Sequence, residues 1–328
     1  MLATKLISVG DIQTVNVDDA LIGPGDIVIR VEAAGICGTD RHLFKGEFPS
    51  TPDTVLGHEF SGIVVDSGES GLAKGTRVTC DPNTWCGACD YCRQGRVNLC
   101  TNNIPTGIAR DGGFAEYCAF PAHKAHILPA DLNPLFGAFC EPLACTLHGM
   151  DIGNANAGER VIVIGGGVIG LMAVQLAKLA GAEVLLLTRN PAKQELGKAL
   201  GADYAAGTAE EALEHWPEGA ELVVECAGVP ATVEMCPSLT RTGGRIVVLG
   251  VLPQSTKVSI EPFDLLFREI QMSYSFLNPF THERAAQMIA SGVVKIEPLI
   301  TRTISLEEVP AVVANNAPAG EVRAIVVP

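Results

Sequence analysis

The sequence predicts an α/β protein of two domains, in which a β-rich first domain precedes a domain built on a parallel sheet. Three observations lead to this prediction. The chain has 328 residues, which is about the length of two ordinary domains. Up to about Asn133, β-branched residues alternate or cluster between glycine, proline and aspartate. From Gly158 onward, short apolar strands alternate with helical segments, as in parallel sheets that are covered by helices on both faces.

Individual elements follow from the same patterns. In the first region the pattern predicts strands over residues 26–33 and 60–65. In the second region it predicts strands over residues 160–164, 183–187, 221–225 and 244–249, with helices over residues 168–180 and 192–200. After about Pro279 it predicts one helix near residues 285–291 and a last strand over residues 321–327.

Composition excludes several classes of function. The formal net charge of −14 makes the chain a poor general binder of nucleic acid or of an anionic membrane, because both depend on cationic contacts. No apolar run reaches the roughly 18–20 residues of a membrane helix, and residues 1–10 do not resemble a secretory signal. The eleven cysteines are odd in number and partly clustered, which favours metal ligation in a reducing compartment. We therefore expect a cytoplasmic protein.

Four of the cysteines form a closely spaced motif, CGACDYCRQGRVNLC. Cys86, Cys89, Cys92 and Cys100 are separated by gaps of two, two and seven residues, which lets the four thiolates converge on one centre. Such a ligand set suits a closed, tetrahedral Zn²⁺ site of the structural type. An iron–sulfur cluster is the alternative, but the Cys-Pro that ends the usual bacterial motif is absent. The motif therefore predicts a structural zinc.

Three further segments carry a mixed set of metal ligands. They are GICGTD with Cys37, GHE with His58 and Glu59, and CEPLA with Cys140 and Glu141. Cysteine, histidine and carboxylate together suit a Zn²⁺ that keeps one position for water or substrate. Each segment alone indicates little. Their joint occurrence ahead of a dinucleotide motif predicts a second, catalytic zinc.

A glycine-rich turn, GGGVIG, follows the predicted strand over residues 160–164. Gly165, Gly167 and Gly170 match the G-x-G-x-x-G pattern. The first permits a tight turn, the second lets the backbone approach a pyrophosphate, and the third allows close packing of helix on strand. The helix that follows presents N-terminal NH groups, which bind phosphate. The turn, with the strand and helix around it, predicts a dinucleotide site.

These motifs together resemble those of the zinc-dependent medium-chain dehydrogenase family, in its polyol (sorbitol-type) and threonine dehydrogenase branches. The resemblance rests on GICGTD, GHE, CGACDYCRQGRVNLC, EPLAC and GGGVIG, and extends over essentially the whole chain. It implies a GroES-like β catalytic domain over residues 1–145 and a Rossmann domain with a doubly wound parallel sheet over residues 146–278. It also implies that residues 279–328 return to the catalytic domain and that the active site lies between the two domains.

The resemblance implies roles for individual residues. Cys37, His58 and Glu59 would be ligands of the catalytic zinc, with Glu141 close to the metal or exchanging with Glu59 and water. Thr39 and His42 stand where similar enzymes carry the substrate proton to solvent; the alternative is that Thr39 only shapes a turn and His42 lies at the surface. The cofactor is expected to contact Gly165, Gly167, Val168, Ile169, Gly170, Thr188, Arg189, Lys193, Cys226, Leu249, Gly250, Val251, Phe276, Leu277 and Asn278.

The choice of dinucleotide depends on the end of the second strand of the Rossmann domain. An acidic residue there normally accepts hydrogen bonds from the NAD ribose, but this chain has Thr188, Arg189 and Asn190. Arg189 can pair with a 2′-phosphate, and Lys193 could add a second cation. The alternative is that Arg189 stacks on adenine or faces solvent and NAD is used. We expect NAD(P), with a preference for NADP, and two zinc ions per chain.

The predicted function is transfer of a hydride between a secondary alcohol or polyol and NAD(P). Sorbitol itself is disfavoured, because Leu277 and Asn278 replace the Arg-Tyr pair of sorbitol-type enzymes. The loop over residues 107–114 is more similar to the threonine branch, so an L-threonine-type amino-alcohol dehydrogenase is one alternative. The other is a non-enzymatic dinucleotide- or zinc-binding protein on the same fold, which would be expected to lack the ligand and relay residues present here.

The expected partners are a small-molecule substrate and further copies of the chain. The family resemblance implies a homodimer or homotetramer in which the edge strand of the Rossmann sheet pairs between subunits. In the sequence, the apolar run over residues 245–252 is a hint of such an edge.

Overall fold

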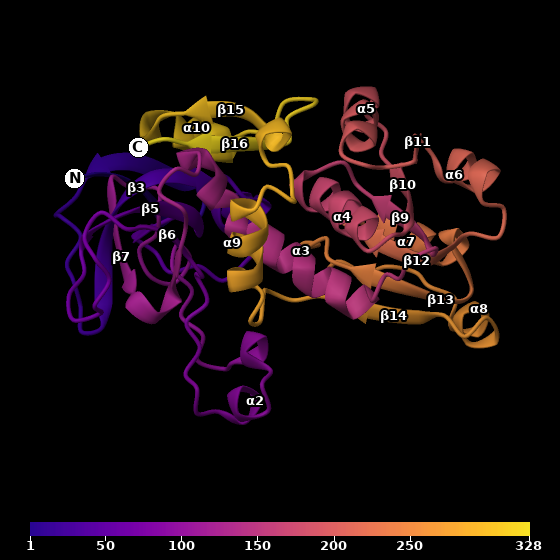
Figure 1. Ribbon diagram of the computed structural model, residues 1–328, viewed down its shortest axis with the longest axis horizontal. Coiled ribbons are helices and arrows are strands. Elements are labelled where there is room, and N and C mark those ends of the chain that lie inside the picture. Colours follow the sequence, from indigo (N-terminus) through magenta and orange to yellow (C-terminus); the bar gives the residue numbers. More distant parts are fainter. The chain divides into compact units, whose positions relative to one another are not determined.

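The computed structural model describes residues 1–328 and divides into two compact units (Figure 1). Unit 1 comprises Met1–Ala144 and Pro279–Pro328, and unit 2 comprises Cys145–Asn278. Unit 1 is built on largely antiparallel sheets and unit 2 on one parallel sheet with helices. The predicted α/β class is confirmed.

The sheets of unit 1 are formed mostly by strands that precede residue 128. One sheet has the order β2-β1-β4, and a larger one has the order β15-β16-β3-β5-β6-β8, with β7 paired to β3. All neighbouring strands are antiparallel except β15 and β16. The strands are β1 (Leu2–Ser8), β2 (Asp11–Asn16), β3 (Asp26–Gly35), β4 (Thr54–Val55), β5 (Glu59–Asp66), β6 (Arg77–Cys80), β7 (Tyr117–Pro121), β8 (Ala125–Ile127), β15 (Ile300–Ile304) and β16 (Arg323–Val326).

The core of unit 1 joins the start and the end of the chain. Phe60 and Phe120 meet edge to face, with ring centroids 5.6 Å apart, and are packed in one cluster with Leu306 and Val309 of the C-terminal segment. Burial of each such side chain contributes about 1.5–3 kcal/mol. Ile325 of β16 pairs with Gly35 of β3. The C-terminal segment is therefore a structural part of unit 1.

Helices of unit 1 are short and lie between the strands. They are α1 (Gly38–Phe44), α2 (Asp90–Arg93), α9 (His282–Ala290) and α10 (Val309–Ala314), with 3₁₀ turns η1 (Val97–Leu99), η2 (Ala122–Lys124), η3 (Pro134–Phe139), η4 (Glu297–Leu299) and η5 (Leu306–Glu308). The sequence predicted a β-rich region here and did not predict the helix α1. There the Asp40 carboxylate accepts a hydrogen bond from the backbone NH of Cys37, 2.8 Å away, and so caps the N-terminus of a helix.

Unit 2 is a six-stranded parallel sheet with the order β11-β10-β9-β12-β13-β14. In chain order this is 3-2-1-4-5-6, the Rossmann arrangement, in which the direction of winding reverses beside the first strand. The elements are β9 (Arg160–Ile164), α4 (Val168–Leu179), β10 (Glu183–Leu187), α5 (Pro191–Ala199), β11 (Tyr204–Ala206), α6 (Ala209–His215), β12 (Ala220–Glu225), α7 (Pro230–Leu239), β13 (Thr240–Val248), α8 (Pro262–Phe267) and β14 (Gln271–Tyr274).

One expectation about unit 2 needs correction. The apolar run over residues 245–252 belongs largely to β13, which lies between β12 and β14 and is not an edge strand. Its apolar character reflects burial on both faces. The edge is the short strand β14, which the sequence did not identify because its pattern, Gln271–Tyr274, is too short and polar. The other predicted strands and helices exist, with ends that differ by a few residues.

The helix α3 (Cys140–Gly153) begins in unit 1 and ends in unit 2. Its first turn was predicted only as a segment of metal ligands, and the helix itself was not predicted. No helix in the structure combines the length and apolar character required to cross a membrane.

A buried polar cluster lies beside α9 in unit 1. His282 is 2 % exposed, its Nε2 is 3.3 Å from Thr79 Oγ1, and its ring stacks on that of His126 at 4.9 Å. Burial lowers the pKa of His282 to about 3, while Asp81 acts in the opposite direction. His282 is thus neutral in the folded chain at any pH near neutrality.

We predict that His282 makes the fold sensitive to acid. The unfolded chain binds a proton at His282 below about pH 6.5 and the folded chain does so only near pH 3. The contribution of neutral His282 to the free energy of unfolding is therefore fully present above pH 6.5. It falls as the pH drops from about 6.5 toward 3, by up to about 1.4 kcal/mol per pH unit.

Urea unfolding of wild type, His282→Phe and the exposed control His215→Gln between pH 7 and pH 5 measures this effect. His282→Phe should be less stable at pH 7 but lose less stability on acidification than the other two. Zinc loss in acid affects all three alike. An equal decrease in the free energy of unfolding of all three proteins between pH 7 and pH 5 would contradict the prediction.

Candidate metal centres and dinucleotide site

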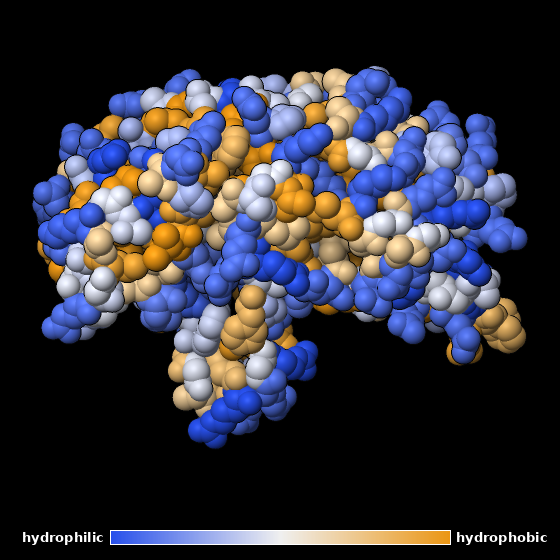
Figure 2. Space-filling model, viewed as in Figure 1, coloured by the Kyte–Doolittle hydropathy of each residue, from blue (hydrophilic) through white to orange (hydrophobic).

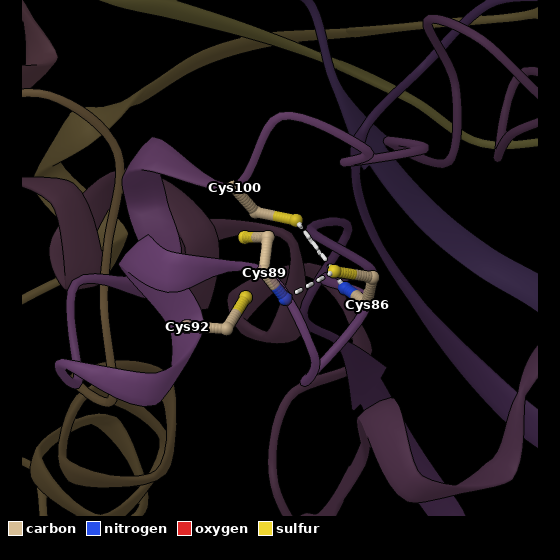
Figure 3. A group of neighbouring side chains, drawn as sticks. All are labelled: Cys86, Cys89, Cys92 and Cys100. Atoms are coloured by element: carbon tan, nitrogen blue, oxygen red, sulfur yellow. Dashed lines mark hydrogen bonds between the residues drawn. The ribbon is translucent and has the colours of Figure 1, made fainter.

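Four cysteines of unit 1 converge as the sequence predicts. The sulfurs of Cys86, Cys89, Cys92 and Cys100 all lie within 4.8 Å of one another (Figure 3). Backbone NH groups point at them: Cys89 N is 3.4 Å from Cys86 Sγ, and Cys86 N is 3.3 Å from Cys100 Sγ. Hydrogen bonds from the Ala88 and Cys89 backbone lower the pKa of Cys86 to about 6. The pKa of Cys89 is also lowered, whereas burial and the neighbouring thiols raise that of Cys92 to about 12. Four sulfurs within reach of one another are the ligand set of a structural Zn²⁺.

The segment before this motif attaches it to the rest of unit 1. Trp85 precedes Cys86, and the Lys124 ammonium lies 2.9 Å from the centroid of its indole ring. The same ammonium pairs with Asp81 at 3.1 Å, and Phe280 meets the indole edge to face at 5.6 Å. Lys124 is only 2 % exposed, so the carboxylate and the ring together compensate for the loss of its hydration. Rigid attachment of Trp85 orients the first cysteine ligand.

A second group brings together Cys37, His58 and Glu59. One ligand atom from each lies within 4.8 Å of the others, and His58 and Glu59 are buried. The convergence follows from the sheet, because Gly35 at the end of β3 pairs with Glu59 at the start of β5. Cys37 leaves β3 two residues later as the N-cap of α1. Thiolate, imidazole and carboxylate on one side of a site suit Zn²⁺.

Two residues that the sequence analysis missed orient these ligands. Asp40 is fully buried, and its Oδ1 lies 3.5 Å from His58 Nδ1 while its Oδ2 accepts from Cys37 N. Burial lowers the pKa of His58, but the Cys37 sulfur and Asp40 outweigh this and raise it well above its usual value. Asp40 Oδ1 and His58 Nδ1 are within ion-pair distance but do not form a well-directed hydrogen bond. A carboxylate that faces Nδ1 leaves Nε2 to a metal. The spacing of Cys37 and Asp40, three residues, is that of a helix cap and was a usable signal.

The second missed residue is Arg323 of β16. It is 5 % exposed, lies 3.0 Å from Glu59 Oε2 through Nη1, and donates from the same nitrogen to the Ile36 carbonyl. Despite this proximity Glu59 Oε2 is buried without a well-directed hydrogen bond, which leaves a lone pair for a cation. No sequence signal pointed to Arg323, because it is far from Glu59 along the chain and reaches it only through the pairing of β16 with β3.

The other residues predicted for this centre lie outside the group of three ligands. Glu141 is 7 % exposed in the first turn of α3 and is not in the group of three ligands. Thr39 and His42 lie three residues apart on α1, and therefore on one side of it. The Thr39 side chain makes no hydrogen bond, whereas the His42 side chain bonds to Glu47. Arg110, in the loop similar to the threonine branch, pairs with Asp26 at 2.9 Å.

The glycine-rich turn of unit 2 has the geometry that the motif predicts. Gly165 follows β9 with φ +107°, a conformation that favours glycine. A Cβ on Gly170 would lie 1.8 Å from the Gly165 carbonyl oxygen, so only glycine fits there. Gly167 is the N-cap of α4, and a Cβ on it would meet nothing within 4 Å. Open space in front of a helix N-terminus is what a pyrophosphate requires.

The other predicted cofactor residues follow the carboxyl ends of the parallel strands. Val168 and Ile169 begin α4, and the remaining residues follow β10, β12, β13 and β14, the edge where Rossmann sheets bind ligands. These residues are Thr188, Arg189, Lys193, Cys226, Leu249, Gly250, Val251, Phe276, Leu277 and Asn278. Lys193 approaches the turn, because a Cβ on Gly166 would lie 2.9 Å from its Cβ. Arg189 is exposed and forms no ion pair or hydrogen bond.

Glu225 organises this edge and was also missed. It is fully buried at the end of β12, and its Oε1 accepts from Ala227 N at 2.8 Å, Gly228 N at 2.9 Å and Thr232 Oγ1 at 2.7 Å. Three donors on one oxygen compensate for much of the cost of burying a carboxylate. The loop after β12 is held in place by these bonds.

Comparison with known families agrees with the metal groups and with the dinucleotide site. "Alcohol dehydrogenase GroES-like domain" matches residues 23–130, and "Zinc-binding dehydrogenase" matches residues 168–291. D-arabinitol dehydrogenase 1 of Uromyces fabae is 30% identical over 91% of this chain and 88% of its own length. The chain belongs to the zinc-binding alcohol dehydrogenase family. The predicted GroES-like and Rossmann folds are confirmed, as is the prediction of a zinc-dependent NAD(P) dehydrogenase.

Two further proteins are similar to this chain over most of its length. L-threonine 3-dehydrogenase of Burkholderia cenocepacia is 31% identical over 88% of this chain and 87% of its own length. A crystal structure described as that of a zinc-binding dehydrogenase from Sinorhizobium meliloti 1021 bound to NADP is 51% identical, with a TM-score of 0.97. It covers 100% of this chain and 99% of the other.

We predict two zinc ions per chain with separable roles. Cys86→Ser should lose one zinc and lower the melting temperature by roughly 10 °C or more, because structural zinc contributes directly to folding. His58→Ala should lose the other zinc and all turnover but keep the melting temperature within a few degrees. Metal analysis and thermal unfolding of both variants, each the control for the other, test this. One zinc or fewer in untreated wild type would refute it.

Proposed function

We propose that the protein oxidises a secondary alcohol group of a polyol and uses NADP as the acceptor. The observation that carries the proposal is the group of Cys37, His58 and Glu59. Asp40 contacts His58 and Arg323 contacts Glu59, so that both ligands have a buried charged neighbour. These three residues are the proposed zinc ligands, and Cys86, Cys89, Cys92 and Cys100 the proposed structural set. Glu141 remains a prediction as an exchanging ligand.

The proposed chemistry divides between the bound groups and the chain. When bound, zinc polarises the substrate oxygen and the nicotinamide accepts a hydride. Thr39 has a free hydroxyl on α1 and passes the substrate proton outward. His42, on the same side of α1, accepts a proton and releases it to water. Asp40 keeps His58 in the orientation and tautomer that a metal ligand needs.

Support for NADP comes from the end of β10. Arg189 has no acidic partner there, and Asn190 caps α5 by accepting from Ala192 N at 2.9 Å. This cap fixes the backbone of the turn that carries Arg189, and the unpaired guanidinium is available to a 2′-phosphate. Lys193, in the first turn of α5, adds a second positive charge near the glycine turn. The Sinorhizobium meliloti protein, which is similar over its whole length, is described as bound to NADP.

The polyol class is supported by the relative that acts on D-arabinitol. A threonine substrate is the second candidate, because a relative of similar identity is an L-threonine 3-dehydrogenase. The loop similar to that branch gives less support than its sequence indicated, since Arg110 is engaged by Asp26 and by the Ala119 carbonyl at 3.1 Å.

We also propose a homodimer or homotetramer formed through β14. This strand is the open edge of the sheet in unit 2. The neighbouring α8 exposes large apolar side chains, with Phe263 63 %, Leu266 72 % and Phe267 70 % exposed (Figure 2). An open edge beside exposed apolar area favours pairing with a second copy. Light scattering at micromolar concentration distinguishes such an oligomer from a 34.4 kDa monomer.

A cytoplasmic location is proposed as well. All eleven cysteines are free thiols in the structure, including buried ones such as Cys80 and Cys140. A reducing compartment preserves both these thiols and the thiolates of the zinc sites.

A substrate panel tests the proposed function. Zinc-loaded protein is assayed by nucleotide absorbance with pentitols, hexitols, simple secondary alcohols and L-threonine, each with NADP and NAD. We expect the highest kcat/KM with a polyol, and no turnover by His58→Ala. Turnover of L-threonine alone would replace the polyol assignment with the second candidate. No turnover of any alcohol by protein with two zinc ions would refute the proposal.

For Arg189 we predict a change of cofactor. Loss of a charge-assisted pair worth about 1.5–3 kcal/mol should lower kcat/KM for NADP by roughly 10- to 100-fold in Arg189→Asp, with little loss for NAD. Lys198→Asp, in the last turn of the helix α5 that follows Arg189, is the control and should leave the preference unchanged. Wild-type protein that is tenfold better with NAD would show that Arg189 does not bind a 2′-phosphate.

A further inference from the structure

The C-terminus of α1 folds the chain back onto the helix. The backbone NH of Glu47 donates to the His42 carbonyl at 2.9 Å, and that of Gly46 donates to the Leu43 carbonyl at 3.1 Å. This pair of bonds is a Schellman motif, and Gly46 has the left-handed φ of +71° that the motif requires. A Cβ on Gly46 would also lie 2.8 Å from Val9 Cγ1. Glu47 is therefore placed beside His42 by the backbone itself.

The side chains of these two residues meet where a Schellman motif usually has an apolar contact. Glu47 Oε2 lies 2.5 Å from His42 Nδ1, with the side chains 31 % and 20 % exposed. The imidazole ring stacks on Phe48, with centroids 4.7 Å apart and planes 23° apart. One ring nitrogen is bonded and one ring face is covered, so His42 has a defined orientation with Nε2 as its remaining polar atom.

We propose that Glu47 is a positioning residue for the proton relay, holding His42 in the tautomer whose Nε2 can accept a proton. The inference rests on the proposed function, in which His42 receives the proton passed on by Thr39. A carboxylate accepts only from Nδ1–H, so the neutral ring carries its proton on Nδ1 and a lone pair on Nε2. When Nε2 takes up a proton, the imidazolium that forms faces the Glu47 charge. Release of that proton to water restores the starting state.

Other charged groups near His42 do not perform this task. Arg41, the preceding residue, donates to the Val312 and Asn315 carbonyls. The helix α10, which packs on α1, contains no ionisable side chain. Lys45 at the C-cap is exposed and forms no ion pair. Glu47 is the one charged partner within ion-pair distance of His42.

Imidazole NMR on the zinc-loaded protein tests the positioning directly, without a substrate. The chain has seven histidines, and His42→Gln identifies the signal of His42. In wild type, ¹H–¹⁵N spectra should show the Nδ1–H tautomer. In Glu47→Gln this preference should be lost, because an amide can donate a hydrogen bond to Nδ1 as well as accept one from it. Glu69→Gln, an exposed acid without a partner, is the matched control and should match wild type.

Kinetics then show whether the orientation serves the reaction. With the best alcohol of the panel and NADP, Glu47→Gln should lower kcat about 10- to 100-fold near neutral pH. In a His42→Gln background, Glu47→Gln should have no further effect. Phe48→Leu removes the stacking partner but keeps the carboxylate, and should retain the wild-type tautomer.

The outcomes separate this inference from the proposed function. An Nε2–H tautomer in wild type, or the same tautomer in wild type and Glu47→Gln, would overturn the role of Glu47. An equal loss of kcat in the presence and absence of His42 would also overturn it, since Glu47 would then act through the fold. If His42→Gln itself keeps the wild-type kcat and pH profile, the relay in the proposed function fails, whatever the spectra show.

Discussion

The register between β3 and β5 is the constraint on which the metal centre of unit 1 depends. Because Gly35 pairs with Glu59, the chain leaving β3 toward Cys37 and the chain entering β5 through His58 emerge side by side. A shift of one residue would reverse the faces of the strand and separate the three ligands. The helix that Cys37 caps then carries Asp40, Thr39 and His42, so the same pairing positions the residues that orient a ligand and those proposed to move a proton.

Buried charges around the two metal groups are compensated in a consistent way. Asp40, Arg323 and Lys124 are each almost inaccessible to solvent, and each faces a partner of complementary charge or an aromatic ring. Burying such groups costs more than a single ion pair usually returns, so their value lies in geometry more than in stability. They hold a ligand or a ligand-bearing loop in one orientation. Removing one partner would leave the other charge buried and uncompensated.

In unit 2, backbone geometry keeps the proposed binding site in one conformation. The reversal of winding beside β9 leaves the ends of β9 and β12 open to a ligand, and the glycine turn keeps side chains out of that space. Glu225 fixes the loop after β12, and Asn190 fixes the turn after β10. The dinucleotide would meet NH groups and short loops that are already ordered, which reduces the entropy lost on binding.

Local patterns were sufficient for features that depend on neighbouring residues. The cysteine spacing, the glycine turn and the alternation of strand and helix in unit 2 could be predicted, because short gaps bring ligands together and apolar periodicity reports burial. The set of Cys37, His58 and Glu59 was predicted from the resemblance to a known family, because its members meet only through the pairing of β3 with β5. The roles of Arg323 and Glu47 could not. Arg323 reaches Glu59 through pairing of strands from opposite ends of the chain. Glu47 reaches His42 because Gly46 adopts a left-handed turn at the end of a helix that the pattern did not predict. The edge strand β14 was not predicted for a related reason. The position of a short polar strand, central or at an edge, depends on the order of the strands, which is a property of the folded sheet.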